Sequence, residues 1–244
     1  MKILIDSSLI REEEWFESFP VFINNVEDTN NKEHIVEILS KKNNTTAYLS
    51  FGKLKQKYLL DEDEEAVIFT IPKSMSGQWN TYNNQNKRKN VLILEGTSLF
   101  TNKEDVKRIL ERQIPLKEIE KEIKKLNMQV KMSGVVLNAR TLNLKGRIHT
   151  LFAMLIKTAK VKIRMEWKQG EWIKDKVSLN GTVLIKKLIV NKKQVNLICS
   201  DISNSKANKV ISKLAKEYPD IVFKKQFMTN SMLAHSGQDF VVIY

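Results

Sequence analysis

Small polar side chains recur in this sequence at the ends of predicted strands and helices. They are Ser7 and Ser8, Thr45 and Thr46, Ser74 and Ser76, and His235 and Ser236. In an open parallel sheet, strand ends and helix starts gather at one edge, where ligands bind. Hydroxyls and an imidazole suit a carboxylate or phosphate group better than bond-breaking chemistry, because the pattern pairs no nucleophile with a general base. We therefore expect a binding site and no catalytic residues.

Residues 66–79, AVIFTIPKSMSGQW, form the most informative of these segments. The apolar run Ala66–Ile71 is rich in β-branched and aromatic residues, which predicts a buried strand. Gly77–Asn80 then begins a predicted helix, where free backbone N–H groups and the helix dipole favour an anion. A serine here is also a common N-cap, so the segment alone does not distinguish an anion site from a cap.

Strand-like and helix-like segments alternate along the chain, which predicts parallel sheet covered by helices. The first half indicates strands at Ile3–Ile5, 66–71 and Val91–Leu94. Helices are expected at Leu9–Ser18, Asn31–Lys42, Phe51–Leu60, from 77 to about 82, at Lys103–Arg112 and from Pro115. We expect an α/β protein of two domains, residues 1–129 with a parallel sheet flanked by helices and residues 130–244 with a mixed sheet and helices.

The second half has exposed alternating strands as well as buried ones. Strands are expected at 134–137, Lys160–Glu166, around Trp172 after a turn at Gly170, and at Val195–Cys199, Ile221–Phe223 and Phe240–Tyr244. Helices are expected from Gly146 to about Lys157, at Gly181–Ile189, and at Ser203–Glu217 with Asp201 or Ser203 as the cap.

The composition is strongly basic, with 41 Lys and Arg against 28 Asp and Glu and a net charge of +13. Such a charge is typical of proteins that bind nucleic acid or anionic membranes, but lysines spread along a whole chain also form an ordinary solvated surface. Cys199 lies in an apolar run, which predicts a buried thiol. The sequence shows no signal-peptide pattern and no apolar segment near the ~18–20 residues of a membrane span, so we expect a cytoplasmic protein.

Catalytic and metal-binding patterns are sparse. The three histidines are scattered, no Cys and His spacing suits zinc, and the glycine-rich phosphate-binding and nucleophile-elbow motifs are missing. Asp6 ends the first strand, as in some metal-dependent hydrolases, but a helix cap explains it more simply. We expect no metal and no cofactor.

In their order along the chain, these segments resemble the DegV family of fatty-acid-binding proteins. The family's opening Thr-Asp-Ser corresponds to Ile5-Asp6-Ser7, and its Thr pair to Thr45-Thr46. Its Ile-Ser-Ser-x-Leu-Ser-Gly-Thr-Tyr segment corresponds to residues 71–79, where Pro72 and Lys73 replace two serines. Its Gly-Gly-Arg-Ile motif corresponds to residues 145–148, and its His-Thr-Gly-Pro-Gly segment to residues 235–239.

The resemblance implies two α/β domains with an acyl chain buried between them. It implies that the fatty acid carboxylate is bound by Thr45, Thr46, Ser76 and His235, with Ser7, Gly77 and Ser236 in support. It also implies presentation of the acid to a fatty acid kinase that makes acyl phosphate, with Arg147 at the kinase contact. An anionic membrane surface is then a transient partner, and nucleic acid is not expected. The alternatives are a basic nucleic-acid-binding protein and a metal-dependent hydrolase that uses Asp6.

Overall fold

The computed structural model describes residues 1–11, 13–28, 30, 32–40, 44–58, 61–138, 161–168 and 170–244. The chain divides into two compact units. The N-terminal unit comprises Met1–Asn31, Thr45–Val130 and Gln169–Glu171, and the C-terminal unit comprises Lys32–Asn44, Lys131–Lys168 and Trp172–Tyr244. The sequence did not suggest the place of Lys32–Asn44 in the second unit, and the domain boundary between residues 129 and 130 stays a prediction.

A parallel sheet forms the centre of the N-terminal unit. Its strand order is β2-β1-β6-β7, with β1 at Lys2–Asp6, β2 at Glu17–Phe19, β6 at Ala66–Thr70 and β7 at Val91–Glu95. All three pairings are parallel. Every residue of β6 is buried, as expected for a strand covered on both faces. The carboxyl ends of these strands therefore share one edge, as the sequence predicted.

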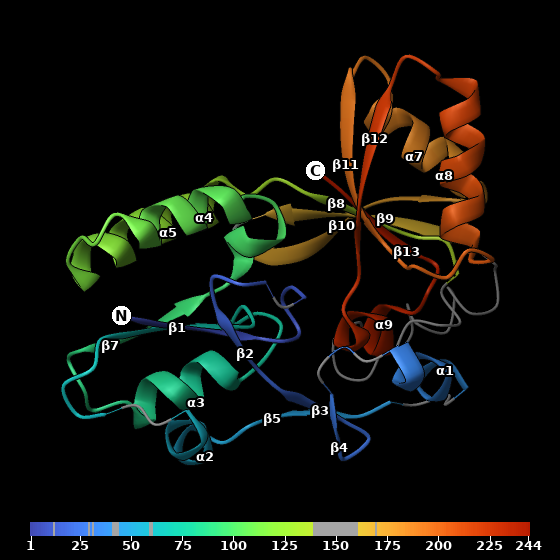
Figure 1. Ribbon diagram of the computed structural model, residues 1–244. Coiled ribbons are helices and arrows are strands. Elements are labelled where there is room, and N and C mark those ends of the chain that lie inside the picture. Colours follow the sequence, from blue (N-terminus) through green and yellow to red (C-terminus); the bar gives the residue numbers. More distant parts are fainter. Residues whose placement is uncertain are drawn as a thin grey trace. The chain divides into compact units, whose positions relative to one another are not determined.

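Helices cover both faces of this sheet (Figure 1). On one face lie α2 (Phe51–Lys57) and α3 (Gln78–Gln85), and on the other lie η1 (Thr97–Phe100), α4 (Lys103–Glu111) and α5 (Leu116–Gln129). The first face packs Phe51, Leu54 and Tyr82 against side chains of the four strands. The second face is closed by helices with strongly one-sided apolar patterns, whose buried residues include Val106, Ile119 and Ile123.

A small antiparallel sheet belongs to the same unit. It contains β4 (Val26–Asp28), β3 (Val21–Ile23) and β5 (Thr46–Tyr48), in that order. Asn24 and Asn25 join β3 to β4 with φ values of 53° and 68°. Asparagine tolerates this left-handed conformation, which tight hairpin turns require.

The C-terminal unit contains a mixed sheet with the strand order β10-β9-β8-β13-β11-β12. The strands are β8 (Ser133–Val136), β9 (Lys162–Lys168), β10 (Glu171–Ser178), β11 (Gln194–Cys199), β12 (Val222–Phe227) and β13 (Phe240–Ile243). β11 and β12 pair in parallel, and the pairings β11–β13, β13–β8 and β8–β9 are antiparallel. β9 and β10 meet at Gly170, whose φ of 87° favours glycine.

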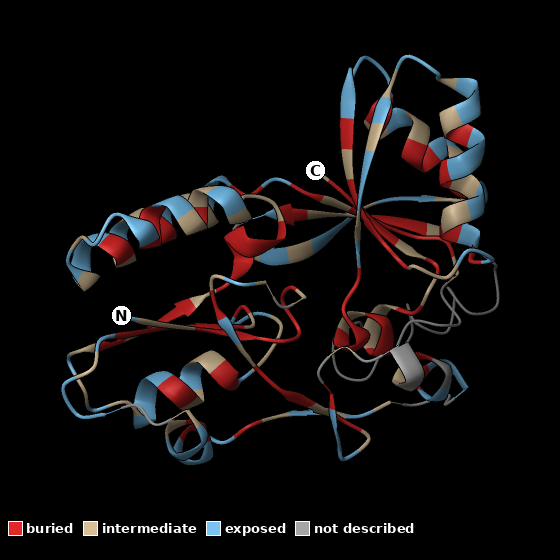
Figure 2. Cartoon of the chain, in the orientation of Figure 1, coloured by how far each residue is buried: buried red, intermediate tan, exposed pale blue. Residues whose placement is uncertain are grey.

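The helices of this unit are α1 (Lys32–Ser40), α7 (Gly181–Ile189), α8 (Lys206–Glu217) and α9 (Asn230–Ser236). α7 and α8 pack Leu184, Ile211 and Leu214 against β8, β11 and β13, and Figure 2 shows the buried stripe on each helix facing the sheet. α1 packs against α9. The buried thiol of Cys199 belongs to this core, as predicted.

The predicted fold class is confirmed, a parallel sheet with helices and a mixed sheet with helices. One predicted element is wrong: the helix at Leu9–Ser18 does not form. Ser8 N–H donates to Asp6 Oδ1 and Leu9 N–H to the Asp6 carbonyl, which closes a tight turn, and the chain then returns as β2 beside β1. Parallel pairing of β2 with β1 buries Phe19 completely.

Three further predictions concern the C-terminal unit. α8 begins three residues later than expected, and its N-cap is Ser205, which accepts from Asn208 N–H, in place of Asp201 or Ser203. Residues 235–236 precede the last strand, as expected, and they form the end of α9. The helix predicted from Gly146 to about Lys157 lies outside the described residues.

Candidate functional site

Ser76 lies in the loop between β6 and α3. Pro72 is the second residue of this loop, and its carbonyl accepts from Met75 N–H at 2.8 Å and Ser76 N–H at 3.1 Å. Ser76 Oγ in turn accepts from Gln78 N–H at 3.2 Å, at the first residue of α3. The structure records no acceptor for the Ser76 hydroxyl proton among the described residues, so this proton can be donated to a ligand.

Gln78 connects this loop to the end of β1. Its side chain is fully buried, Oε1 accepts from Ile71 N–H at 3.0 Å, and Nε2 donates to Asp6 Oδ2 at 2.6 Å. A buried amide costs free energy unless both of its ends are paired, and here both are. The carboxyl ends of β1 and β6 are thus joined by one side chain.

Asp6 is completely buried beneath this loop. Burial raises the pKa of its carboxyl group, and hydrogen bonds from Ser8 and Gln78 oppose the increase. A catalytic metal ligand needs neighbouring carboxylates or imidazoles, and the described segments contain no group of three His, Cys, Asp or Glu side chains able to bind a metal ion. The observed partners of the Asp6 carboxylate, Ser8 N–H and Gln78 Nε2, give it a structural role at the end of β1.

Ser7 follows Asp6 and contacts the small sheet. Its hydroxyl accepts from Val21 N–H at 3.1 Å and donates to the Asp28 carbonyl at 3.4 Å. The side chain therefore already has partners in the fold. Its supporting role toward a ligand stays a prediction.

Thr45 and Thr46 lie at the start of β5. Thr45 is exposed, and its backbone exchanges hydrogen bonds with Asn24. Thr46 is half-buried and pairs with Ile23 in the small sheet. β5 is linked to α3 by the hydrogen bond between Tyr48 Oη and Thr81 Oγ1 at 3.0 Å. β5, which begins at Thr46, therefore contacts α3, and α3 is the helix that directly follows the Ser76 loop.

His235 and Ser236 belong to the C-terminal unit, in the last turn of α9. His235 is half-buried, and Ser236 Oγ donates to the Met232 carbonyl at 2.7 Å. The helix ends at Gly237, whose positive φ of 72° is a backbone angle that glycine adopts readily. The assignment of His235 to the same site as Ser76 stays a prediction.

The structure adds little support for two of the predicted residues, Gly77 and Arg147. A Cβ atom placed on Gly77 would meet nothing within 4 Å, so the described contacts do not require glycine there. Arg147, predicted to contact the kinase, lies outside the described residues. Lys73, which replaces a serine of the family segment, is exposed and has its ammonium group 5.9 Å from the centre of the Trp79 ring.

Asp239 replaces the glycine of the family's His-Thr-Gly-Pro-Gly segment. The side chain is buried, and its oxygens accept from Lys206 N–H at 2.7 Å and Asn138 Nδ2 at 3.1 Å. A carboxylate at the first turn of α8 satisfies a helix N–H and complements the helix dipole. This departure from the family pattern therefore has a structural explanation.

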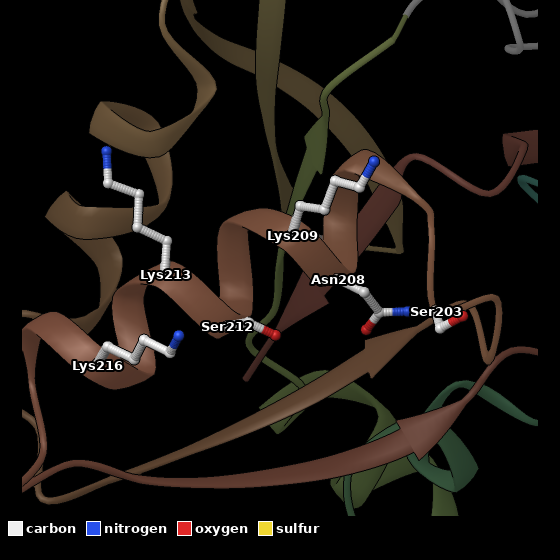
Figure 3. A pocket seen from close by; sticks show the side chains of 6 residues that line it. All are labelled: Ser203, Asn208, Lys209, Ser212, Lys213 and Lys216. Atoms are coloured by element: carbon white, nitrogen blue, oxygen red, sulfur yellow. The ribbon is translucent and has the colours of Figure 1, made fainter.

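A shallow pocket of about 370 Å³ lies along α8 (Figure 3). It is lined by Ser203, Asn208, Lys209, Ser212, Lys213 and Lys216. The three lysines are exposed, and their side chains point in different directions. Asn208 Nδ2 is already bonded to the Ser200 and Ile202 carbonyls, at 2.8 Å each. Divergent lysines form a diffuse positive surface, which differs from a site built around one anion.

The role of Gln78 was not predicted from the sequence. The sequence does show that Gln78 stands where the family pattern has Thr. Its hydrogen-bond partner, Asp6, is 72 positions earlier in the chain, so no local pattern connects the two residues. The available signal was Asp6 itself, because a carboxylate at the end of a buried strand requires a donor.

The sequence model described as an uncharacterised protein of the DegV family matches residues 1–244. The chain belongs to the DegV family. No curated protein sequence matches it. Within the described segments, we find no helix with the length and apolar character needed to cross a membrane.

Several solved DegV structures share the fold. A DegV family protein from Eubacterium eligens, loaded with heptadecanoic acid, has a TM-score of 0.73 at 14% identity, covering 100% of this chain and 98% of that one. The fatty acid kinase B3 protein of Streptococcus pneumoniae, loaded with linoleic acid, has a TM-score of 0.73 at 11% identity, covering 99% and 97%. A hypothetical protein from Thermotoga maritima, described as revealing a fatty acid binding function, has a TM-score of 0.69 at 18% identity, covering 99% and 97%.

The raised pKa of Asp6 predicts a specific pH dependence of stability. A carboxyl whose pKa is higher in the folded than in the unfolded protein stabilises the fold below the unfolded value, near 3.8, and this contribution is lost as pH rises through the folded pKa. The free energy of unfolding of the wild type minus that of Asp6→Asn should therefore fall as pH rises above about 4. Urea unfolding of both proteins across this range measures the difference, and a difference that stays constant or increases with pH would contradict the assignment.

Proposed function

We propose that this protein binds a long-chain fatty acid and presents its carboxylate to a fatty acid kinase, which forms the acyl phosphate. The observation that carries the proposal is the match of the whole chain to the DegV family, together with a shared fold in proteins solved with heptadecanoic and linoleic acid. One of these relatives is itself a fatty acid kinase subunit by name. The proposed role requires no catalytic residue, metal or cofactor in this chain, and we propose the cytoplasm as its location.

The carboxylate-binding residues that we propose are Thr45, Thr46, Ser76 and His235, supported by Ser7, Gly77 and Ser236. Ser76 has the strongest support, because its oxygen is held by Gln78 N–H while its proton can still be donated. Burial of the acyl chain contributes ~0.8 kcal/mol per CH₂, on the order of 10 kcal/mol for a common fatty acid. The polar residues therefore need only orient and satisfy the carboxylate. For Arg147, the kinase contact is proposed from the sequence motif alone.

Removal of the proposed donors should weaken fatty acid binding without abolishing it. Ser76→Ala and His235→Ala should each cost ~1–3 kcal/mol of binding free energy, because a buried carboxylate oxygen loses its partner. Titration of the delipidated protein with a fluorescent long-chain fatty acid measures the affinity. The matched control is Ser212→Ala, an exposed serine on α8 that should leave the affinity unchanged. Wild-type affinity in both site variants would remove these residues from the site.

We also propose an anionic membrane surface as a transient partner, from which the fatty acid is collected or to which it returns. Residues 181–244 contain ten lysines and four carboxylates. Lys209, Lys213 and Lys216 add an exposed row along α8, and no ion pair to them is recorded among the described residues. A diffuse positive surface of this kind attracts anionic lipid headgroups without a specific site.

Charge reversal along α8 should weaken association with vesicles that contain anionic lipid. The triple change Lys209→Glu, Lys213→Glu and Lys216→Glu should reduce partitioning by at least about tenfold, since each cation near such a surface contributes about 1 kcal/mol. The control makes the same change at Lys117, Lys121 and Lys125 of α5, a helix in which glutamates alternate with lysines. Equal losses for the two triple variants, or binding that does not depend on salt, would contradict this part of the proposal.

A further inference from the structure

The amide of Gln78 can adopt only one orientation. Ile71 N–H can only donate, so the acceptor end of the amide, Oε1, must face it. The donor end, Nε2, therefore faces Asp6, and Asp6 Oδ2 must accept. The other carboxylate oxygen, Oδ1, accepts from Ser8 N–H at 2.8 Å.

This arrangement uses Asp6 in its ionised form. Two N–H donors require two acceptor oxygens. A protonated Asp6, or an asparagine at this position, would offer only one acceptor atom that carries no hydrogen. Burial opposes ionisation and raises the Asp6 pKa. Tyr82, the neighbouring titratable group in α3, has its own pKa raised by burial and also by the Asp6 charge. The hydrogen bonds from Ser8 and Gln78 to the Asp6 carboxylate therefore offset part of the free-energy cost of its buried charge.

The same glutamine also determines the position of Ser76. Gln78 contacts the loop at both ends, through Oε1 at Ile71 and through its backbone N–H at Ser76 Oγ. A third contact, from Lys73 N–H to Glu95 Oε1 at 2.8 Å, ties the middle of the loop to the end of β7. Displacement of the Gln78 side chain would therefore release the start of the loop and shift the residue that holds Ser76.

We propose that Asp6 and Gln78 are positioning residues for Ser76, holding its hydroxyl where it donates to the carboxylate of the bound acid. This inference rests on the proposed function. Gln78 replaces the Thr of the family motif, and its amide spans the distance from Ile71 N–H to the buried carboxylate. Neither residue contacts the ligand in this account, and both act through Ser76.

Gln78→Glu is the sharpest test, because it makes the contact depend on pH. The introduced carboxyl group can still accept from Ile71 N–H, but its second oxygen faces Asp6 Oδ2. Two carboxyl groups this close share one proton at low pH and repel each other when both ionise. Fatty acid affinity should be within about threefold of the control at pH 5 and at least about tenfold weaker at pH 8. The control is Gln85→Glu, the same change at an exposed position of α3. The two variants are compared at each pH, so the effect of fatty acid ionisation on affinity is the same for both.

A double-mutant cycle separates positioning from a general loss of structure. If Gln78 acts through Ser76, the tenfold loss at pH 8 should shrink to about twofold or less when Ser76 is already alanine. An undiminished loss in that background would overturn the inference while leaving fatty acid binding established. Circular dichroism checks folding at both pH values. If Gln78→Glu unfolds at pH 8, Asp6→Asn replaces it in the same cycle at pH 7, where an additive effect would equally overturn the inference. A wild-type protein that binds no fatty acid would instead refute the proposed function itself.

Discussion

The side chain of Gln78 joins the carboxyl ends of β1 and β6 through its hydrogen bonds with Asp6 and Ile71 N–H, and the proposed site depends on this link. β6 is buried along its whole length, so the polar groups at its carboxyl end cannot rely on water. Ile71 N–H is satisfied by Gln78, and Thr70 Oγ1 donates to the Leu94 carbonyl. The shape of the following loop, and with it the position of Ser76, results from satisfying these groups.

The elements predicted most accurately are those that depend on local sequence. The strand at 66–71, the turn at Pro72 and the helix after Gly77 all follow from an apolar run and neighbouring turn residues. The structure has the strand and the start of the helix within one residue, and the helix ends three residues later than expected. The helix expected at Leu9–Ser18 failed because Asp6-Ser7-Ser8 resembles a helix cap in sequence. Whether this segment becomes helix or strand is determined by pairing with β1 and burial of Phe19, which no local pattern contains.

In the candidate site too, local sequence patterns were predicted and contacts between distant residues were not. Residue types and order indicated a set of hydroxyls for an anion, and Ser76 does have a proton to donate. The residue that positions it was not found, because the role of Gln78 depends on Asp6, far away in the sequence, and on an amide orientation fixed by Ile71 N–H. Ser7 shows the opposite case, in which a hydroxyl expected to support the ligand is already bonded to Val21 and Asp28. These hydrogen bonds join Ser7 to residues distant in the sequence, so only the folded structure reveals them.

The central claim is that this DegV family protein carries a fatty acid, and native mass spectrometry of the purified protein tests it most directly. The account predicts an added mass equal to one long-chain fatty acid, which is lost on delipidation and regained when a fatty acid is supplied. A purified protein without this added mass, which also takes up no fatty acid after delipidation, would contradict the account.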